Sequence, residues 1–345
     1  RFYLLAYRGD IMRVINLKSP PSIIGYGTVV GKREHEGPLS DDFDMHDESE
    51  KFATDTWEKA ESEMQRLALN LALKKSNVKE SDIDALFAGD LMNQCVGSSY
   101  GLEGFGVPFF GLYGACSTFA EGSILASLMT NTKIMQKCAA VSSSHFCTAE
   151  RQFRFPLEYG GQRTPTSQRT ATAAGAMIFS SEGEGPFVRE VLPGKIVDFG
   201  ITDINNMGAA MAPAACDTIS EYFKETGKKP SDFDLILTGD LGKEGHSILT
   251  EFMGGLGYDM KNVYNDCGLM LYSAGSQDMH AGGSGCGCSA SVICGHIMKR
   301  FEKKTLHDIL YIATGALMSP GSLQQGRSIP GIAHLVRICD SESKT

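Results

Sequence analysis

Apolar residues recur at two spacings along the chain, and together they predict alternating helices and short strands. From Asp55 to about Lys75 they stand at helical intervals, and Asp55 with Glu58 forms the pattern of a capped helix start. Further helices are predicted over 217–226 and 289–301. Short apolar runs predict strands at 22–31, 83–88, 107–113, 138–142, 174–180, 262–267, 309–314 and 332–339. Helices that alternate with short apolar strands indicate a layered α/β architecture.

Part of this pattern is repeated within the chain. Residues Lys79–Leu91 align without a gap with Lys229–Leu241 at an offset of 150, and seven of the thirteen positions are identical. Each copy follows a predicted helix and ends with Gly-Asp-Leu. Continued from these segments, both halves of the chain give the order β-α-β-α-β-α-β-β. The simplest interpretation is a duplicated unit.

The acidic, glycine-rich string 181–186 is the natural boundary between the two copies. We predict an N-terminal half over 12–183 and a C-terminal half over 184–345. Residues 1–11 fit neither copy, so we expect them to be an N-terminal extension, with Met12 as the better natural start.

The bulk composition narrows the class of protein. The formal net charge of −9 argues against nucleic acid or an anionic membrane surface as a partner. Ten cysteines are spread along the chain without a cleavable signal pattern at its start, so we expect reduced thiols and a soluble, cytosolic protein. Apolar runs stay well short of the roughly 20 residues needed to cross a bilayer, and any membrane role is expected to be peripheral.

The stretch Gly111–Leu128 carries the strongest chemical signal. An apolar strand ends in a tight Gly-Ala turn, and the helix that follows begins at Cys116. A thiol at a helix start lies at the positive end of the helix dipole, which lowers its pKa and favours the reactive thiolate. The alternative is a small buried residue that fills a corner between strand and helix. The spacing alone leaves both hypotheses open.

The duplication predicts which loops meet. Corresponding loops converge at one end of the sheets, where ligands bind in open α/β folds. These are the loops after Asp90, around Cys116, around Asp240, and around Gly283 and Ser284. Asp90 and Asp240 become a pseudo-symmetric pair suited to acid–base chemistry or to positioning a ligand. The alternative is that each aspartate caps the turn or helix after its own strand.

A second candidate region spans 142–169 and carries four arginines in a chain that is acidic overall. Arginine binds carboxylates through two parallel hydrogen bonds, and interleaved aromatic residues supply stacking walls, so the region suits a small, flat, anionic ligand. Arg151 is the candidate for the anionic end, and His145 for holding or polarising the ligand. The alternatives are ion pairs with the glutamates of the same region and a structural histidine.

Signals for metals and cofactors are weak. Cys286 and Cys288 lack a second pair of ligands, and the acidic loop that holds His35 and His46 is typical of a solvated loop. The glycine-rich turn 281–287 lacks the lysine of a phosphate-binding loop. We predict neither a bound metal nor a cofactor.

Several longer strings are typical of one family. They lie between Ile15 and Arg337, at 88–94, 110–118, 148–154, 158–162, 198–203, 208–214, 265–270, 281–286 and 313–320. With the duplication, they make the chain resemble the thiolase and ketoacyl-synthase superfamily, and within it the stage V sporulation protein AD family. The resemblance implies a layered α-β-α-β-α sandwich and a homodimer. It also implies that the protein binds dipicolinic acid (pyridine-2,6-dicarboxylate) and supports its uptake into the spore with membrane proteins of the same operon, at the spore inner membrane.

The resemblance is incomplete at the catalytic positions. Condensing enzymes of the ketoacyl-synthase III type pair their cysteine with a histidine and an asparagine, whereas the matching positions here carry Asp240 and, approximately, Ser284. A carboxylate cannot donate a hydrogen bond to a thioester oxyanion, and its charge opposes a thiolate. The departure favours a binding protein over an enzyme.

Three hypotheses therefore describe the function. The first is a protein that binds dipicolinic acid or its calcium chelate, with the two aspartates at the metal, in a pocket formed by Asp90, Cys116, His145, Arg151, Asp240, Gly283 and Ser284. The second is an acyltransferase or condensing enzyme with Cys116 as the nucleophile. The third is a scaffold that recruits the membrane subunits.

Overall fold

The structure, a computed structural model, describes residues 13–153 and 163–341. The main strands of the first half are β2 (Ser22–Gly31), β4 (Ala85–Gly89), β5 (Phe109–Gly111), β6 (Lys137–Ser144) and β8 (Ala173–Ser180). Those of the second half are β9 (Phe187–Leu192), β10 (Leu235–Thr238), β11 (Tyr264–Asp266), β13 (Asp308–Ala316) and β14 (Gly331–Cys339). The short strands are β1 (Ile15–Asn16), β3 (Met45–Asp47), β7 (Arg169–Thr170) and β12 (Gly283–Ser284).

The long helices are α2 (Trp57–Ser76), α4 (Thr118–Asn131), α6 (Met207–Thr226) and α7 (Gly242–Gly255). A further helix begins as α9 (Cys286–Val292), widens into a π-helical turn over Ile293–Ile297, and ends as α10 (Met298–Glu302). The remaining helices are α1 (Lys32–His35), α3 (Val96–Leu102), α5 (Phe146–Phe153), α8 (Cys267–Leu271) and α11 (Pro320–Gln324).

The sheet has the same strand order in both halves. The first half runs β5-β4-β6-β8-β2 and the second runs β11-β10-β13-β14-β9. In each, the first three strands are parallel and the last two are antiparallel to their neighbours. One pairing, between Ser22 and Phe187, joins β2 to β9 and connects the halves.

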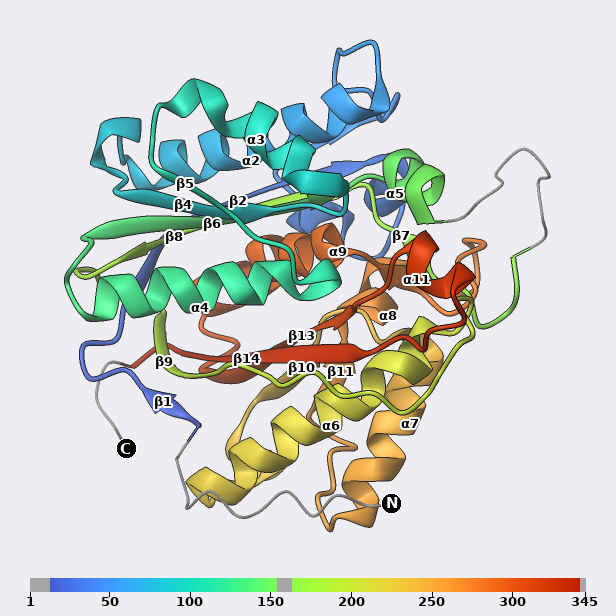
Figure 1. The fold of residues 1–345 in the computed structure, drawn as a ribbon. Helices are drawn as coiled ribbons and strands as arrows, with labels where there is room; N and C mark the ends of the chain where they lie inside the picture. Colours follow the sequence, from blue (N-terminus) through green and yellow to red (C-terminus); the bar gives the residue numbers. More distant parts are fainter. Residues whose placement is uncertain (1–12, 154–162, 342–345) are drawn as a thin grey trace.

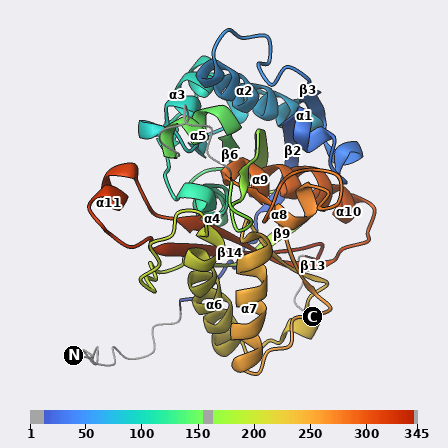
Figure 2. The ribbon, with the colours of Figure 1, turned by 90° about the vertical axis from the view of Figure 1, so that its right-hand side faces the viewer.

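The elements stack in five layers, as predicted. Figure 1 shows α2 and α3 on the outer face of the first half-sheet, α4 and α9 between the half-sheets, and α6 and α7 on the outer face of the second. Figure 2, turned by 90°, shows the same separation of the two outer helix layers. Because both half-sheets are covered by helices on both faces, most residues of their main strands are buried, apart from those of the edge strand β5.

The repeated sequence forms the same turn and the same backbone hydrogen bonds in both halves. Each copy begins with a single 3₁₀ turn, Glu80–Asp82 or Pro230–Asp232, that leads into the central parallel strand. The aspartate before that strand then binds the two backbone amides that begin the next parallel strand. Asp84 accepts hydrogen bonds from the amides of Gln136 and Lys137, and Asp234 from those of His307 and Asp308. The retained residues therefore hold the start of one strand to the next.

Two helix starts differ from the sequence prediction. Thr56, and not Asp55, caps α2, since its hydroxyl accepts a hydrogen bond from the Lys59 amide at 3.2 Å. Asp55 instead forms an ion pair with the Lys59 ammonium group. Helix α6 begins at Met207, ten residues before the predicted 217–226 segment, because Asn206 caps it through the amide of Ala209.

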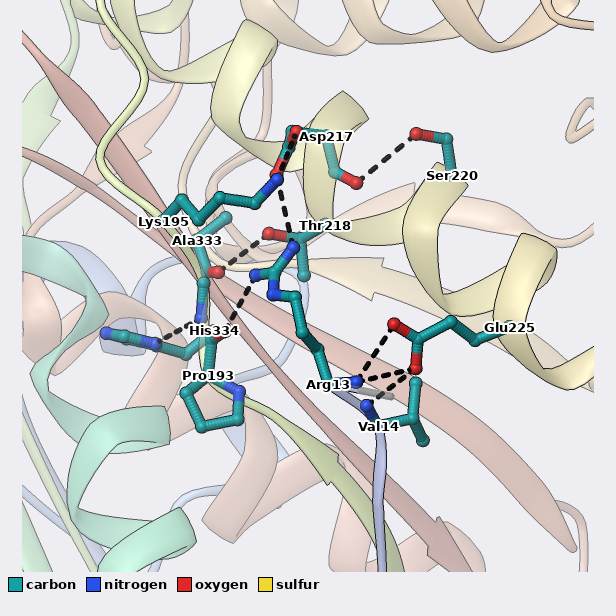
Figure 3. A network of polar contacts seen from close by, with 11 residues as sticks. Arg13, Val14, Pro193, Lys195, Asp217, Thr218, Ser220, Glu225, Ala333 and His334 are labelled. Carbon is teal, nitrogen blue, oxygen red and sulfur yellow. Dashed lines mark hydrogen bonds and ion pairs between the residues drawn. The ribbon is translucent and has the colours of Figure 1, made fainter. Parts of the chain in front are cut away.

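The start of the described chain crosses to the C-terminal half (Figure 3). The backbone amides of Arg13 and Val14 donate to the carboxylate of Glu225 on α6, and the Arg13 guanidinium donates to the carbonyl of Pro193. Strand β1 then pairs antiparallel with β9. The predicted N-terminal extension, residues 1–11, lies outside the described residues.

In the parts of the chain that the structure describes, none of the helices combines the length and the apolarity needed to cross a bilayer.

Candidate functional site

A pocket lies where the loops of the two halves meet, and its empty volume is about 780 Å³, part of it open to solvent. Cys116 and Ala115 line it at the start of the central helix α4. Its apolar lining includes Leu91, Tyr113, Ala149, Phe153, Ile204, Met207, Ala316 and Met318. Its polar lining consists of Glu150, Ser167, Gln168, Thr170, Asn205 and Ser284.

The backbone around Cys116 turns sharply into α4. Residues Ala115–Ser117 form a 3₁₀ turn, and Ala115 has a φ of 52°, a left-handed conformation that is uncommon outside glycine. The turn directs the chain from β5 into the buried helix and leaves the Cys116 thiol 3.7 Å from the Ser284 hydroxyl. A residue from the first half thus meets one from the glycine-rich turn of the second half.

Asp240 lies behind this contact and is fully buried. Its carboxylate accepts hydrogen bonds from the Ser284 hydroxyl at 2.8 Å, the Gly285 amide at 3.0 Å and the Thr314 hydroxyl at 2.9 Å. Burial raises the pKa of Asp240 even though these donors oppose the shift. Asp240 therefore fastens the glycine-rich turn to the end of β13 and fixes the Ser284 side chain beside Cys116.

The sequence left two hypotheses open for Cys116, a reactive thiolate and a buried residue in the corner between strand and helix, and its buried position favours the second. Burial raises the pKa of the Cys116 thiol well above its ordinary value, and the nearby charge of Asp240 raises it further. Loss of solvation outweighs the attraction of the helix start, which acts over only one turn of backbone. The alternative interpretation, a buried neutral thiol between strand and helix, describes this residue.

Asp90 has a different job from Asp240. One oxygen accepts from the Met92 amide, and the other accepts from the amide and hydroxyl of Ser98 in α3. Asp90 therefore caps the turn and helix after its own strand, as the alternative interpretation held. In the second half that role belongs to Asp266, which binds the amides at the start of α7. Asp90 and Asp240 match in sequence but not in contacts, and Asp90 does not line the pocket.

His145 is held entirely by backbone groups. Its Nδ1 accepts from the Cys147 amide, so Nε2 carries the hydrogen and donates to the Glu50 carbonyl at 2.8 Å. Burial lowers the pKa of His145 and keeps the ring neutral. The structure therefore places His145 as a structural residue beside the pocket-lining helix α5, with both ring nitrogens occupied.

Arg151 lies on α5 but outside the pocket lining. Its guanidinium donates to Glu58 at 2.7 Å, and its side chain is 59% exposed. Arg163 binds Asp278, and Arg169 stacks on the Phe146 ring at 3.8 Å. Arg154, with the neighbouring candidate residues up to 162, lies outside the described residues. Arg151 was predicted to bind the anionic end of a ligand. In the structure it forms an ion pair with Glu58 at the surface instead.

Gly283 contributes through its backbone only. Its carbonyl accepts a hydrogen bond from Gln168, and β12 pairs parallel with β7 in a small separate sheet. This pairing brings Gln168 and Thr170 into the pocket lining. Neither residue is predictable from the sequence, because a two-residue strand formed between distant loops leaves no periodic signal.

A buried network of hydrogen bonds leads from Asp90 to α5. Its successive members are Asp90, Ser98, Gln65, Ser143, Glu61 and Thr148. Burial raises the pKa of Glu61 to about 8, and the charge of Asp90 adds to the shift. The shift favours a protonated carboxyl in this network.

Within residues 13–153 and 163–341, no group of three or more histidine, cysteine or acidic side chains is placed to hold a metal. The Cys286 thiol donates to the Ser143 carbonyl at 2.8 Å, and Cys288 is buried in the same helix. The rings of His35 and His46 stack on each other with centroids 3.5 Å apart. Each of these groups therefore has a structural partner.

The fold and the position of Cys116 define the general class of protein. The structure matches 3-oxoacyl-[acyl-carrier-protein] synthase III from Aquifex aeolicus with a TM-score of 0.56, over 92% of this chain and 99% of that chain, at 16% sequence identity. Cerulenin-bound OleA from Xanthomonas campestris gives a TM-score of 0.59 over 94% and 99%, at 13% identity. At these identities the likeness concerns the fold alone. The chain has the thiolase-like fold of the ketoacyl-synthase III enzymes.

Sequence comparison is more specific. The family model described as Stage V sporulation protein AD matches residues 12–339. Stage V sporulation protein AD of Bacillus subtilis (strain 168) is 42% identical over 308 residues, which cover 89% of this chain and 91% of that protein. The chain belongs to the stage V sporulation protein AD family, and the predicted resemblance is confirmed.

Proposed function

We propose that the pocket beside Cys116 binds dipicolinic acid, or its calcium chelate, and that the protein supports uptake of this ligand into the developing spore. The family resemblance supplies the ligand class. The observation that carries the proposal is a largely apolar pocket between loops of the two halves, in which Cys116 is buried and contacts Ser284, which in turn is held by Asp240. Apolar walls with a few fixed polar groups are typical of a site for a small, flat ring.

The same observation weighs against a condensing enzyme. A cysteine nucleophile needs a nearby base or a lowered pKa, and Asp240 acts in the opposite direction on Cys116. The enzyme alternative keeps one supporting fact, namely that Cys116 lines an accessible pocket in a ketoacyl-synthase III fold. It predicts an acylated Cys116 peptide after exposure to acyl-CoA, whereas our proposal predicts no adduct by mass spectrometry.

Narrowing the pocket is expected to abolish ligand binding. Ala316 lines the pocket at the end of β13, so Ala316→Leu places added methyl groups in the ligand space. Calorimetric titration with dipicolinate should show saturable binding to wild type and at least about a tenfold weaker response for Ala316→Leu. Arg151→Ala is the matched control and should bind as wild type, because Arg151 pairs with Glu58 outside the lining.

The comparison ligand in this titration is isophthalate, which lacks the ring nitrogen. A preference for dipicolinate that disappears in Ala316→Leu would support the proposal. Equal binding of dipicolinate by both proteins would contradict it, provided that thermal melting shows both to be folded.

We further propose that the protein is a homodimer joined at β5. This strand ends the sheet order, and Phe109 and Phe110 on it are 39% and 45% exposed. An exposed apolar edge strand is a template for pairing with a second copy. Phe109→Lys is expected to sediment as a monomer at a concentration where wild type is dimeric. Ile134→Lys, at a 74% exposed residue in a different loop, is the control and should stay dimeric.

The role with membrane subunits is proposed on the same family grounds. If the protein carries the ligand to those subunits at the spore inner membrane, pocket substitutions should lower the dipicolinate content of spores. If it acts as a scaffold only, Ala316→Leu spores should contain as much dipicolinate as wild-type spores.

A further inference from the structure

The apolar stripe of helix α7 is wider than the part of it that the core covers. Leu249 and Met253 are fully buried and pack into the core of the second half. Phe252 and Leu256 lie next to them, at the four-residue spacing of neighbours on a helix, and are 37% and 56% exposed. Figure 2 shows α7 beside α6 on the outer side of this half. The stripe therefore continues from the core onto the surface.

The exposed end of this stripe meets an aromatic residue from another segment. Phe199, in the connection between β9 and α6, is 64% exposed, and its ring centroid lies 6.3 Å from that of Phe252. We call Phe199, Phe252 and Leu256 the α7 patch. Gly255 leaves bare backbone beside it, since a Cβ built there would meet no other atom. Single exposed apolar residues are ordinary on a protein surface, whereas a group of them is typical of an interaction site.

The two segments that form the α7 patch are acidic. Residues 196–223 contain four acidic residues, residues 244–260 contain three, and neither segment contains a lysine or arginine. Asp198 and Glu251 are exposed and adjoin Phe199 and Phe252 in the chain. A hydrogen bond from the Ser328 hydroxyl lowers the pKa of Asp198, which favours its charged form. The surroundings of the patch therefore attract cations.

The end of α7 adds partial negative charge to these carboxylates. The last carbonyl groups of a helix attract cations, and lysine or arginine near a helix end interacts favourably with them. The last turn of α7 contains no basic residue, and Glu251 lies directly before it. A cationic side chain from another molecule would therefore interact with both the helix end and the carboxylate.

We propose that the α7 patch docks an amphipathic helix of another protein, whose apolar side chains contact the patch and whose lysine or arginine side chains face Glu251 and Asp198. An exposed apolar stripe at four-residue spacing suits the ridges and grooves of a second helix. The acidic surroundings repel an anionic bilayer, and a second copy would bring the same acidic segments against these. The three patch residues do not line the pocket beside Cys116, so docking here goes beyond the ligand binding proposed above and does not depend on it.

Two synthetic helical peptides of about 18 residues, or five turns, test the docking. Each carries leucine on one face, with lysine on the opposite face of one peptide and glutamate on that of the other. Fluorescence anisotropy should show one lysine peptide bound per wild-type chain, and at least about tenfold weaker binding to the double variant Phe199→Ser, Leu256→Ser. Ile134→Ser, at a 74% exposed residue of a different loop, is the control and should bind as wild type. Equal binding by wild type and the double variant, or tighter binding of the glutamate peptide, would overturn the proposal.

Charge reversal separates the acidic surroundings of the patch from the net charge of the chain. Glu251→Lys should weaken binding of the lysine peptide at least about threefold at low salt, because it places a like charge beside the docked helix. Glu80→Lys makes the same change in net charge at an exposed residue of the first half and should bind as wild type. If the two reversals weakened binding equally, the peptide would respond to net charge alone and the proposal would fail.

The place of binding and the two competing occupants are tested on wild-type protein. Hydrogen exchange should slow at 248–256 when the lysine peptide is added and stay unchanged at 132–137, and binding without protection at 248–256 would contradict docking on α7. Sedimentation and flotation with phosphatidylglycerol vesicles compare wild type with the double variant. If the double variant alone lost self-association, the patch would join copies of this chain, and if it alone lost vesicle binding, the patch would bind lipid. Either result would overturn the proposal.

Discussion

Replacing Asp240 with asparagine is expected to make Cys116 react with iodoacetamide at least about tenfold faster at pH 8, because each unit by which a thiol pKa falls gives about ten times more thiolate. Burial is the main cause of the raised Cys116 pKa, and it stays in the variant. The charge of Asp240 is the second cause, and it is removed. Asparagine keeps an oxygen for the Gly285 amide and the Ser284 hydroxyl, which donate to the same Asp240 oxygen, and the Thr314 hydroxyl can rotate to accept from its amide group.

The measurement follows alkylation of the Cys116 peptide by mass spectrometry over time. Asp266→Asn is the matched control, since Asp266 is equally buried but binds the start of α7 and does not contact Cys116. An alkylation rate that is the same in Asp240→Asn and wild type would mean that Asp240 does not hold Cys116 in its neutral form.

The second large effect concerns Glu61 and pH. Burial raises the pKa of Glu61 from its ordinary value of 4.5 to about 8, so the folded state binds this proton more tightly than the unfolded state does. The resulting stability is fully present below about pH 4.5 and is lost as the pH rises to about 8. Glu61→Gln has no such proton, so its stability relative to wild type should improve by up to roughly 4 kcal/mol between pH 5 and pH 9.

Urea unfolding at pH 5, 7 and 9 checks this prediction. Glu34, another buried carboxylate with a raised pKa, is present in both proteins, so its effect cancels in the comparison. Glu63→Gln, at a surface position of the same helix paired with Arg66, should follow wild type at all three pH values. If the stability of Glu61→Gln ran parallel to that of wild type, Glu61 would be ionised in the fold.

The fold was predictable because the internal repeat allows the two halves of the chain to be compared with each other. The identical residues of the repeat, among them Asp84 and Asp234, make the same local backbone contacts in both halves. Identical sequence in the two copies therefore indicated identical local structure. Boundaries were less accurate where small residues dominate. The first turns of α6 are rich in alanine and glycine and contain Pro213, so they show no helical apolar stripe.

The candidate site was predictable only in part. Cys116 and Ser284 were placed together because each lies at the end of an element whose position the repeat fixes. Gln168 reaches the pocket through the pairing of β7 with β12, which depends on contacts between distant loops. Arg151 was misplaced for a related reason: its residue type suits a carboxylate, but the sequence does not reveal that Glu58 of α2 already occupies it.

The unequal contacts of Asp90 and Asp240 show what a tandem arrangement permits. Two identical half-length chains would carry every substitution twice, and a change that suits one copy would be imposed on the other. Covalent fusion removes that constraint. In the second copy Asp266 binds the amides at the start of the following helix. Asp240 can therefore accept hydrogen bonds from Ser284, Gly285 and Thr314. The two halves are therefore symmetric in their scaffold and asymmetric at the pocket, so the two copies of the repeat have different roles.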